Sequence, residues 1–167
     1  MSLSLYQASV PVFISKLTAL SKLLERAQAH AEAKKFDANN FVGMRLAPDM
    51  LPFSKQVQIA CDASKLACAR ITGTEAPKFE DNETTIDDLK QRIAKTVDYL
   101  KSVPRDGIDG TEAKQITFKV GGQDRTFSGQ DLMLNFATPN VYFHVVTAYA
   151  ILRQGGVEIG KLDYLGL

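Results

Sequence analysis

Apolar and small residues recur at alternating spacings of three and four along residues 6–35, and this pattern restricts the segment to one kind of structure. They are Val10, Phe13, Leu17, Leu20, Leu24, Ala27 and Ala31. Residues at these spacings share one face of an α-helix, so we expect a long helix with that face on a bundle core. Pro11 then either sits in the first turn, with Ser9 as N-cap, or kinks a helix that begins near Ser4.

A second helix is indicated by the same spacing over residues 50–71. Its apolar or small positions are Met50, Phe53, Val57, Ala60, Ser64, Ala67 and Ile71. Asp49 is placed to cap this helix, and Pro52 is tolerable because backbone donors in a first turn have no helical partner. Gly73 ends the helix, and the polar residues 73–84 that follow form a loop.

The third helix is expected from Thr85 to about Ser102. Thr85 and Asp88 form a capping box at its start, and Pro104 follows its end. Apolar residues again mark one face at helical spacing. They are Ile86, Leu89, Ile93, Val97 and Leu100, with Thr96 as the alternative to Val97.

The hydrophobic period changes from helical to two between residues 114 and 127. Gly121-Gly122 lies in the middle of this stretch and supplies residues that adopt positive φ, so we predict a β-hairpin. A last helical region follows, which Pro139 divides into a short helix over 130–137 and a main helix over 139–154. Gly155-Gly156 ends the main helix.

The chain is the size of one domain, and we treat residues 1–167 as a single helical-bundle domain. Its formal net charge is +1, and neither sign of charge gathers into a long block, so we expect neither a nucleic-acid nor a membrane partner. The N-terminal residues do not resemble a secretion signal, and we expect a cytoplasmic protein.

The two cysteines, Cys61 and Cys68, are seven residues apart in a predicted helix. That separation is roughly 10 Å along the axis, too far for a disulfide or for two thiolates on one zinc ion. We therefore expect two small, buried or half-buried thiols.

A family resemblance emerges from the stretch H-V-V-T-A-Y-A-I-L-R-Q-G-G, residues 144–156, and from Y-Q-A-S-V-P-V-F and R-L-A-P-D-M. The first is similar to the closing helix of DinB/YfiT-like proteins, and all three resemble a branch known as a domain of unknown function. The resemblance implies an all-α, up-down-down-up four-helix bundle, into which the residue pattern above inserts a small β-hairpin before the last helix. It also implies a homodimer.

The same resemblance implies a position for a metal site. Metal-binding relatives use one histidine from the second helix and two from the last, one turn apart. The Leu152-Arg153 register places the second of that pair at His144 and the first at Asn140. The histidine of the second helix falls at Gln56 or Gln58.

Amide side chains are poor ligands for zinc and nickel, which prefer imidazole and thiolate. We therefore expect no cofactor and no metal at these degenerate positions, unless Asp49 or Asp62 points inward as a substitute ligand. The residues Gln56, Gln58, Asn140, Tyr142 and His144 would instead line a polar pocket for an unknown small molecule.

Three functions fit the sequence. The first is a metal-free, ligand-binding bundle that has lost the three-histidine site. The second is a thiol transferase or isomerase, either dependent on zinc or nickel at a variant site or assisted by His144 as a general base. The third is a dimeric interaction or scaffold protein. No hydrolase, nucleotide-binding or metalloprotease motif occurs in the chain.

Overall fold

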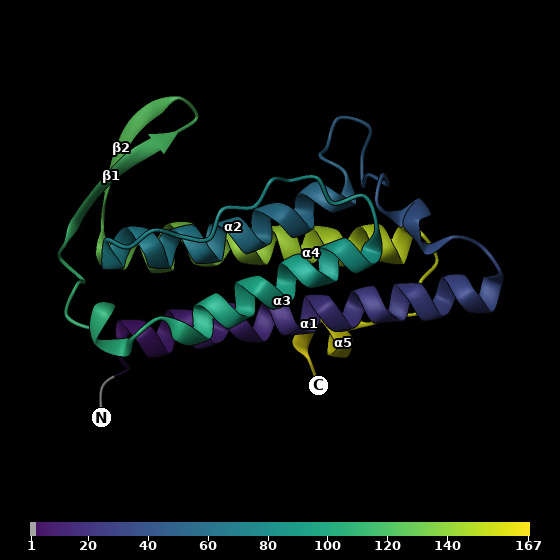
Figure 1. The fold of residues 1–167 in the computed structure, drawn as a ribbon, viewed down its shortest axis with the longest axis horizontal. Coiled ribbons are helices and arrows are strands. Elements are labelled where there is room, and N and C mark those ends of the chain that lie inside the picture. Colours follow the sequence, from purple (N-terminus) through teal and green to yellow (C-terminus); the bar gives the residue numbers. More distant parts are fainter. Residues whose placement is uncertain (1–2) are drawn as a thin grey trace.

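Four long helices form the body of the molecule in a computed structural model that describes residues 3–167. They are α1 (Leu5–Lys34), α2 (Phe53–Thr72), α3 (Ile86–Ser102) and α4 (Thr138–Gln154). In Figure 1, α1 and α3 lie in one layer and α2 and α4 in the other. Helices α2 and α3 run together, opposite to α1 and α4, which confirms the predicted up-down-down-up bundle. The shorter elements are η1 (Ala38–Phe41), η2 (Arg105–Gly107), β1 (Gln115–Val120), β2 (Gln123–Ser128), η3 (Asp131–Ala137) and α5 (Lys161–Leu165).

Helix α1 begins at Leu5 with Ser4 as its N-cap, which decides between the two predicted starts. The Ser4 hydroxyl accepts from the backbone N–H of Gln7, and the Gln7 side chain accepts from the Ser4 N–H, which completes a capping box. Ser9 is not the N-cap, because it lies inside the helix and its hydroxyl donates to the Leu5 carbonyl at 2.6 Å. Pro11 also lies inside the helix, one turn beyond the first.

Helix α2 begins at Phe53, later than expected, and Asp49 does not cap it. The N-cap position is Pro52, which has no side chain able to accept a hydrogen bond. The first free N–H groups of the helix, those of Phe53 and Ser54, instead donate to backbone carbonyls of the preceding loop at 2.8 and 3.1 Å. The cap prediction was wrong because backbone carbonyls distant in sequence carry no residue signature.

Helix α3 has the predicted start and end. The Thr85 hydroxyl accepts from the Asp88 N–H at 3.1 Å, and the Asp88 carboxylate accepts from the Thr85 N–H at 3.0 Å. Residues 74–84, which we call the strap, cross from the end of α2 to the start of α3 along the outside of the bundle (Figure 1).

The hairpin pairs β1 with β2 in antiparallel register, with Val120 opposite Gln123. Gly121 and Gly122 both have positive φ, 59° and 82°, as the two-residue turn requires. The region after the hairpin contains the two predicted helices within one residue of their expected bounds, and the first of them, η3, is π-helical and continues directly into α4. Pro139 is the second residue of α4 and lies just after the junction with η3.

One connected apolar core fills the space between the helices. Every apolar position predicted for α1 and α3 is buried in it, and both cysteines are buried as predicted. Met50 is the exception on the second predicted face, since it is only half-buried and precedes α2. Over residues 3–167, no helix is both long and apolar enough to cross a membrane.

Candidate functional site

His144 and Gln56 meet across the contact between α4 and α2. The Nδ1 atom of His144 lies 2.7 Å from the Oε1 atom of Gln56, and the Gln56 side-chain nitrogen donates to the Leu51 carbonyl at 2.9 Å. Because the Gln56 side-chain nitrogen is the atom that donates to the Leu51 carbonyl, the atom facing His144 is the amide oxygen, which can only accept. The hydrogen therefore resides on Nδ1, and Nε2 carries the lone pair.

The environment of His144 favours its neutral form. The side chain is 8% exposed, and burial lowers the pKa of the imidazole below its ordinary 6.5. No described residue forms a hydrogen bond with Nε2. The hydrogen bonds from Gln56 to Leu51 and from His144 to Gln56 thus leave a neutral imidazole with a fixed tautomer and one unused acceptor, Nε2.

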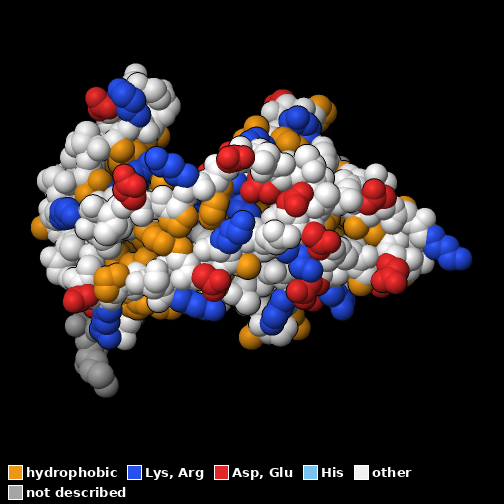
Figure 2. All heavy atoms as spheres, in the orientation of Figure 1, with side chains coloured by type: hydrophobic (Ala, Val, Ile, Leu, Met, Phe, Trp, Pro, Cys, Tyr) orange, Lys and Arg blue, Asp and Glu red, His pale blue; other side chains and the backbone are white. Residues whose placement is uncertain are grey.

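Asn140 lies one helical turn before His144, in a groove between the hairpin and the bundle. Helices α2 and α4 form its floor, and Phe118 and Val120 of β1 form one wall. The groove encloses about 190 Å³. Figure 2 shows the hairpin standing out from the bundle, with apolar side chains gathered below it. Hereafter the α2/α4 face means this groove together with His144 and Gln56.

Two other residues expected in the pocket have different partners. Gln58 is buried, and its side-chain nitrogen donates to Glu83 of the strap at 2.7 Å, away from His144. Tyr142 lies near α1, where the ammonium group of Lys16 is 6.0 Å from its ring centroid. Of the five predicted residues, the structure brings only Gln56 and His144 into contact and places Asn140 one turn away.

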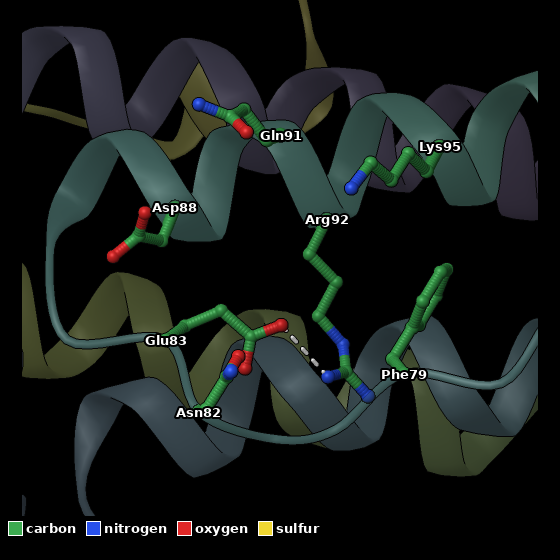
Figure 3. A pocket seen from close by; sticks show the side chains of 7 residues that line it. All are labelled: Phe79, Asn82, Glu83, Asp88, Gln91, Arg92 and Lys95. Carbon is green, nitrogen blue, oxygen red and sulfur yellow. Dashed lines mark hydrogen bonds and ion pairs between the residues drawn. The ribbon is translucent and has the colours of Figure 1, made fainter.

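The partner of Gln58 belongs to a charged cluster that the sequence did not indicate. Arg92 of α3, 2% exposed, donates to Asp62 of α2 at 2.9 Å and to Asp81 and Glu83 of the strap at 2.6 and 2.9 Å. Figure 3 shows Arg92 reaching from α3 toward Glu83, with Phe79 of the strap beside its guanidinium group. These charges pair with one another, so we read this Arg92 cluster as a clamp that holds the strap on the bundle.

The donor set around His144 does not fit a transition metal. Within residues 3–167, no group of three His, Cys, Asp or Glu side chains is placed to hold an ion. Asp62, the predicted substitute ligand, is paired with Arg92 and Lys65, each at 2.9 Å, and Asp49 is exposed. One imidazole and two amides are left, which is a weak set for zinc or nickel.

A family model described as a domain of unknown function (DUF1993) matches residues 5–165. The chain belongs to this family. The fold of this DUF1993 protein is also similar to that of a solved crystal structure, a DinB family member protein from Shewanella denitrificans. The two share 42% sequence identity and a TM-score of 0.88, over 98% of this chain and 92% of the other. No matching relative was found among the curated proteins. The resemblance to DinB-like proteins and to a branch of unknown function is confirmed.

Arg70, which lines the groove with Asn140, was missed by the sequence analysis. Its guanidinium carbon lies 3.9 Å from the ring centroid of Phe118 in the hairpin. The sequence shows only that Arg70 is a basic residue near the end of α2, on a helix whose apolar face consists of small residues. This does not indicate a binding residue unless the position of the hairpin is known. The choice between Gln56 and Gln58 had also stayed open, and Gln56 is the one that contacts His144.

Proposed function

We propose that this DUF1993 protein is a ligand-binding bundle that works without a metal ion, and that its binding site is the α2/α4 face. The observation that carries the proposal is the pair formed by His144 and Gln56, at positions where the family resemblance implies metal ligands. An imidazole that donates to an amide through Nδ1 and keeps Nε2 free suits a hydrogen bond with a small molecule.

The groove at Asn140, one helical turn from His144, supports this function. Small-molecule sites are concave and mostly apolar, with few polar groups that fix orientation. The groove has that character, since aliphatic and aromatic side chains make up most of its lining and Asn140 adds an amide. At about 190 Å³ the groove is below the ~300 Å³ of common drug-sized pockets, so it suits a small ligand.

A fragment screen by ¹H–¹⁵N NMR, on the full chain in the presence of EDTA, tests the proposal. We expect bound fragments to shift the amide signals of Ile59, Ala63, Asn140 and His144 together. The matched control is Ala63→Leu, which fills the groove and leaves the His144–Gln56 pair in place. Hits that shift only other regions, or that are unaffected by Ala63→Leu, would contradict the proposal.

A second candidate is an enzyme in which His144 acts as general base on a low-molecular-weight thiol. It is favoured by the free Nε2 atom and by the burial that lowers the His144 pKa, since a base must be unprotonated at the working pH. Thiol-transfer assays with His144→Ala, beside the half-buried His30→Ala as control, decide this. Equal turnover in both variants would eliminate the candidate.

We also propose that two copies associate, as the family resemblance implies, and that α4 contributes to the interface. Phe143 and Val146 are 56% and 44% exposed and, three residues apart, lie on one face of that helix, where a second copy could cover them. Light scattering of Phe143→Ser, with the exposed Leu162→Ser as control, measures this. A dimer that Phe143→Ser dissociates and Leu162→Ser does not supports the assignment, and a monomeric parent protein refutes it.

A further inference from the structure

Arg70 is a half-buried cation without an anionic partner among residues 3–167. Its guanidinium group packs on the ring of Phe118 at 3.9 Å, and no ion pair or hydrogen bond to a described residue engages it. Burial, with no opposing carboxylate, lowers the pKa of Arg70. Stacking uses the flat face of a guanidinium and leaves its N–H edges free to donate. Arg70 therefore has unused donors at the wall of the groove.

The rest of the groove is chiefly hydrocarbon. Its apolar lining consists of Ile59, Ala63, Leu66, Ala67, Phe118, Val120 and Phe136. Asn140 contributes the only amide side chain of the lining. A volume of about 190 Å³ corresponds to about six waters at ~30 Å³ each, the size of a short acid or a single small ring.

The other charges of the lining already have partners. Asp62 lines the groove, but its carboxylate is paired with Lys65 and with Arg92, which it shares with Asp81 and Glu83. Lys119 adds a positive charge and pairs at 3.2 Å with Asp124 on the exposed hairpin. Among the charged residues that line the groove, Arg70 thus lacks an ion-pair partner in the described part of the chain.

We infer that the groove binds a small apolar carboxylic acid. Its carboxylate accepts from the N–H edges of Arg70 and from the Asn140 amide, and its hydrocarbon lies against Ile59, Leu66 and Phe136. A carboxylate suits the planar fork of arginine, and a free inorganic anion would leave the apolar walls uncovered. This inference rests on the proposed function, because it assigns a ligand class to the same α2/α4 face.

Calorimetric titration of the full chain with hexanoate tests the inference, with hexanamide as the uncharged match. A charge-assisted hydrogen bond increases the affinity by about tenfold or more over that of a ligand that cannot form it. We therefore expect hexanoate to bind at least about tenfold more tightly than hexanamide, and Arg70→Met to remove this preference. Arg26→Met, which deletes an exposed arginine of α1, should leave the affinity unchanged.

Ala63→Leu keeps Arg70 and fills the groove, so loss of hexanoate binding there supports the location even if Arg70→Met fails to fold. If NMR shifts show that hexanoate and hexanamide bind equally well at the α2/α4 face, the carboxylate assignment is overturned and the proposed function still stands. Absence of binding by either probe, together with a fragment screen that finds no ligand at this face, would overturn both.

Discussion

The Nδ1 atom of His144 and the Oε1 atom of Gln56 lie 2.7 Å apart, joining the middle of α4 to the first turn of α2. Gln56 is one of the two positions at which the family resemblance would place the histidine of the second helix. It also determines the imidazole tautomer, because Gln56 donates its own N–H to the Leu51 carbonyl.

Replacing Gln56 with leucine should destabilise the fold by about 1–3 kcal/mol, because it leaves the Nδ1–H of His144 and the Leu51 carbonyl without partners. Urea denaturation measures the change. Gln91→Leu, at an exposed position of α3, is the matched control and should change stability by less than about 0.5 kcal/mol. A Gln56→Leu effect no larger than the control would show that the contact is not held in solution.

The imidazole of His144 should titrate below pH 6.5, since burial disfavours its charged form in the folded state only. The stability linked to this group is then complete above pH 6.5 and is lost as the pH falls through the folded pKa. An NMR titration of the ring protons gives the midpoint directly. A midpoint at or above 6.5 would contradict the buried, neutral imidazole.

Removing the guanidinium group of Arg92 should release the strap. Arg92→Met leaves Asp62, Asp81 and Glu83 without their shared cation. Because Asp62 and Asp81 are partly exposed and keep Lys65 and Lys55, we expect a loss of about 1–3 kcal/mol. Proteolytic cleavage within residues 74–84 should accelerate, and denaturation should show the stability loss. Lys101→Met, which removes an exposed 3.9 Å pair with Asp98, should have an effect below about 1 kcal/mol. Similar effects of the two variants would refute the clamp.

Both cysteines should be almost inert toward a thiol reagent in the folded protein. Burial raises the pKa of Cys61 and of Cys68 from 9.0 to about 12. At pH 8 that shift lowers the thiolate fraction by about 10³, so the reaction with dithionitrobenzoate should be slower by that order than in guanidinium. The variants Cys61→Ala and Cys68→Ala separate the two thiols. A fast native reaction would contradict their burial.

Periodicity and local caps were sufficient to predict most of the fold. The apolar spacing from Val10 to Ala31 identified the buried face of α1, and Thr85 and Asp88 marked the start of α3. These signals are local, so they can be read without knowing the packing. Helix α5 was missed because its five residues are too short for a periodic pattern. Helix α5 packs near Lys16, whose ammonium group lies 4.5 Å from the Tyr164 ring centroid although the two residues are 148 positions apart in the sequence.

The candidate site was predictable only in part. His144 and Asn140 followed from the helix register, but Gln56 and Gln58 are about 200° apart around the helix axis, and sequence alone did not say which faces α4. The structure directs Gln56 to His144 and Gln58 to Glu83. Arg70 acquires its setting from a hairpin more than forty residues away, so no local pattern could identify it.

The metal content of untagged protein tests the central claim, that the His144 site functions without an ion. The protein is purified without chelator, exposed to Zn²⁺ and Ni²⁺, desalted and analysed for bound metal beside His144→Ala. We predict far less than one ion per chain, with no difference between the two proteins, because one imidazole and two amides bind these ions weakly. Near-stoichiometric metal that disappears in His144→Ala would contradict the claim and favour a metal-dependent function.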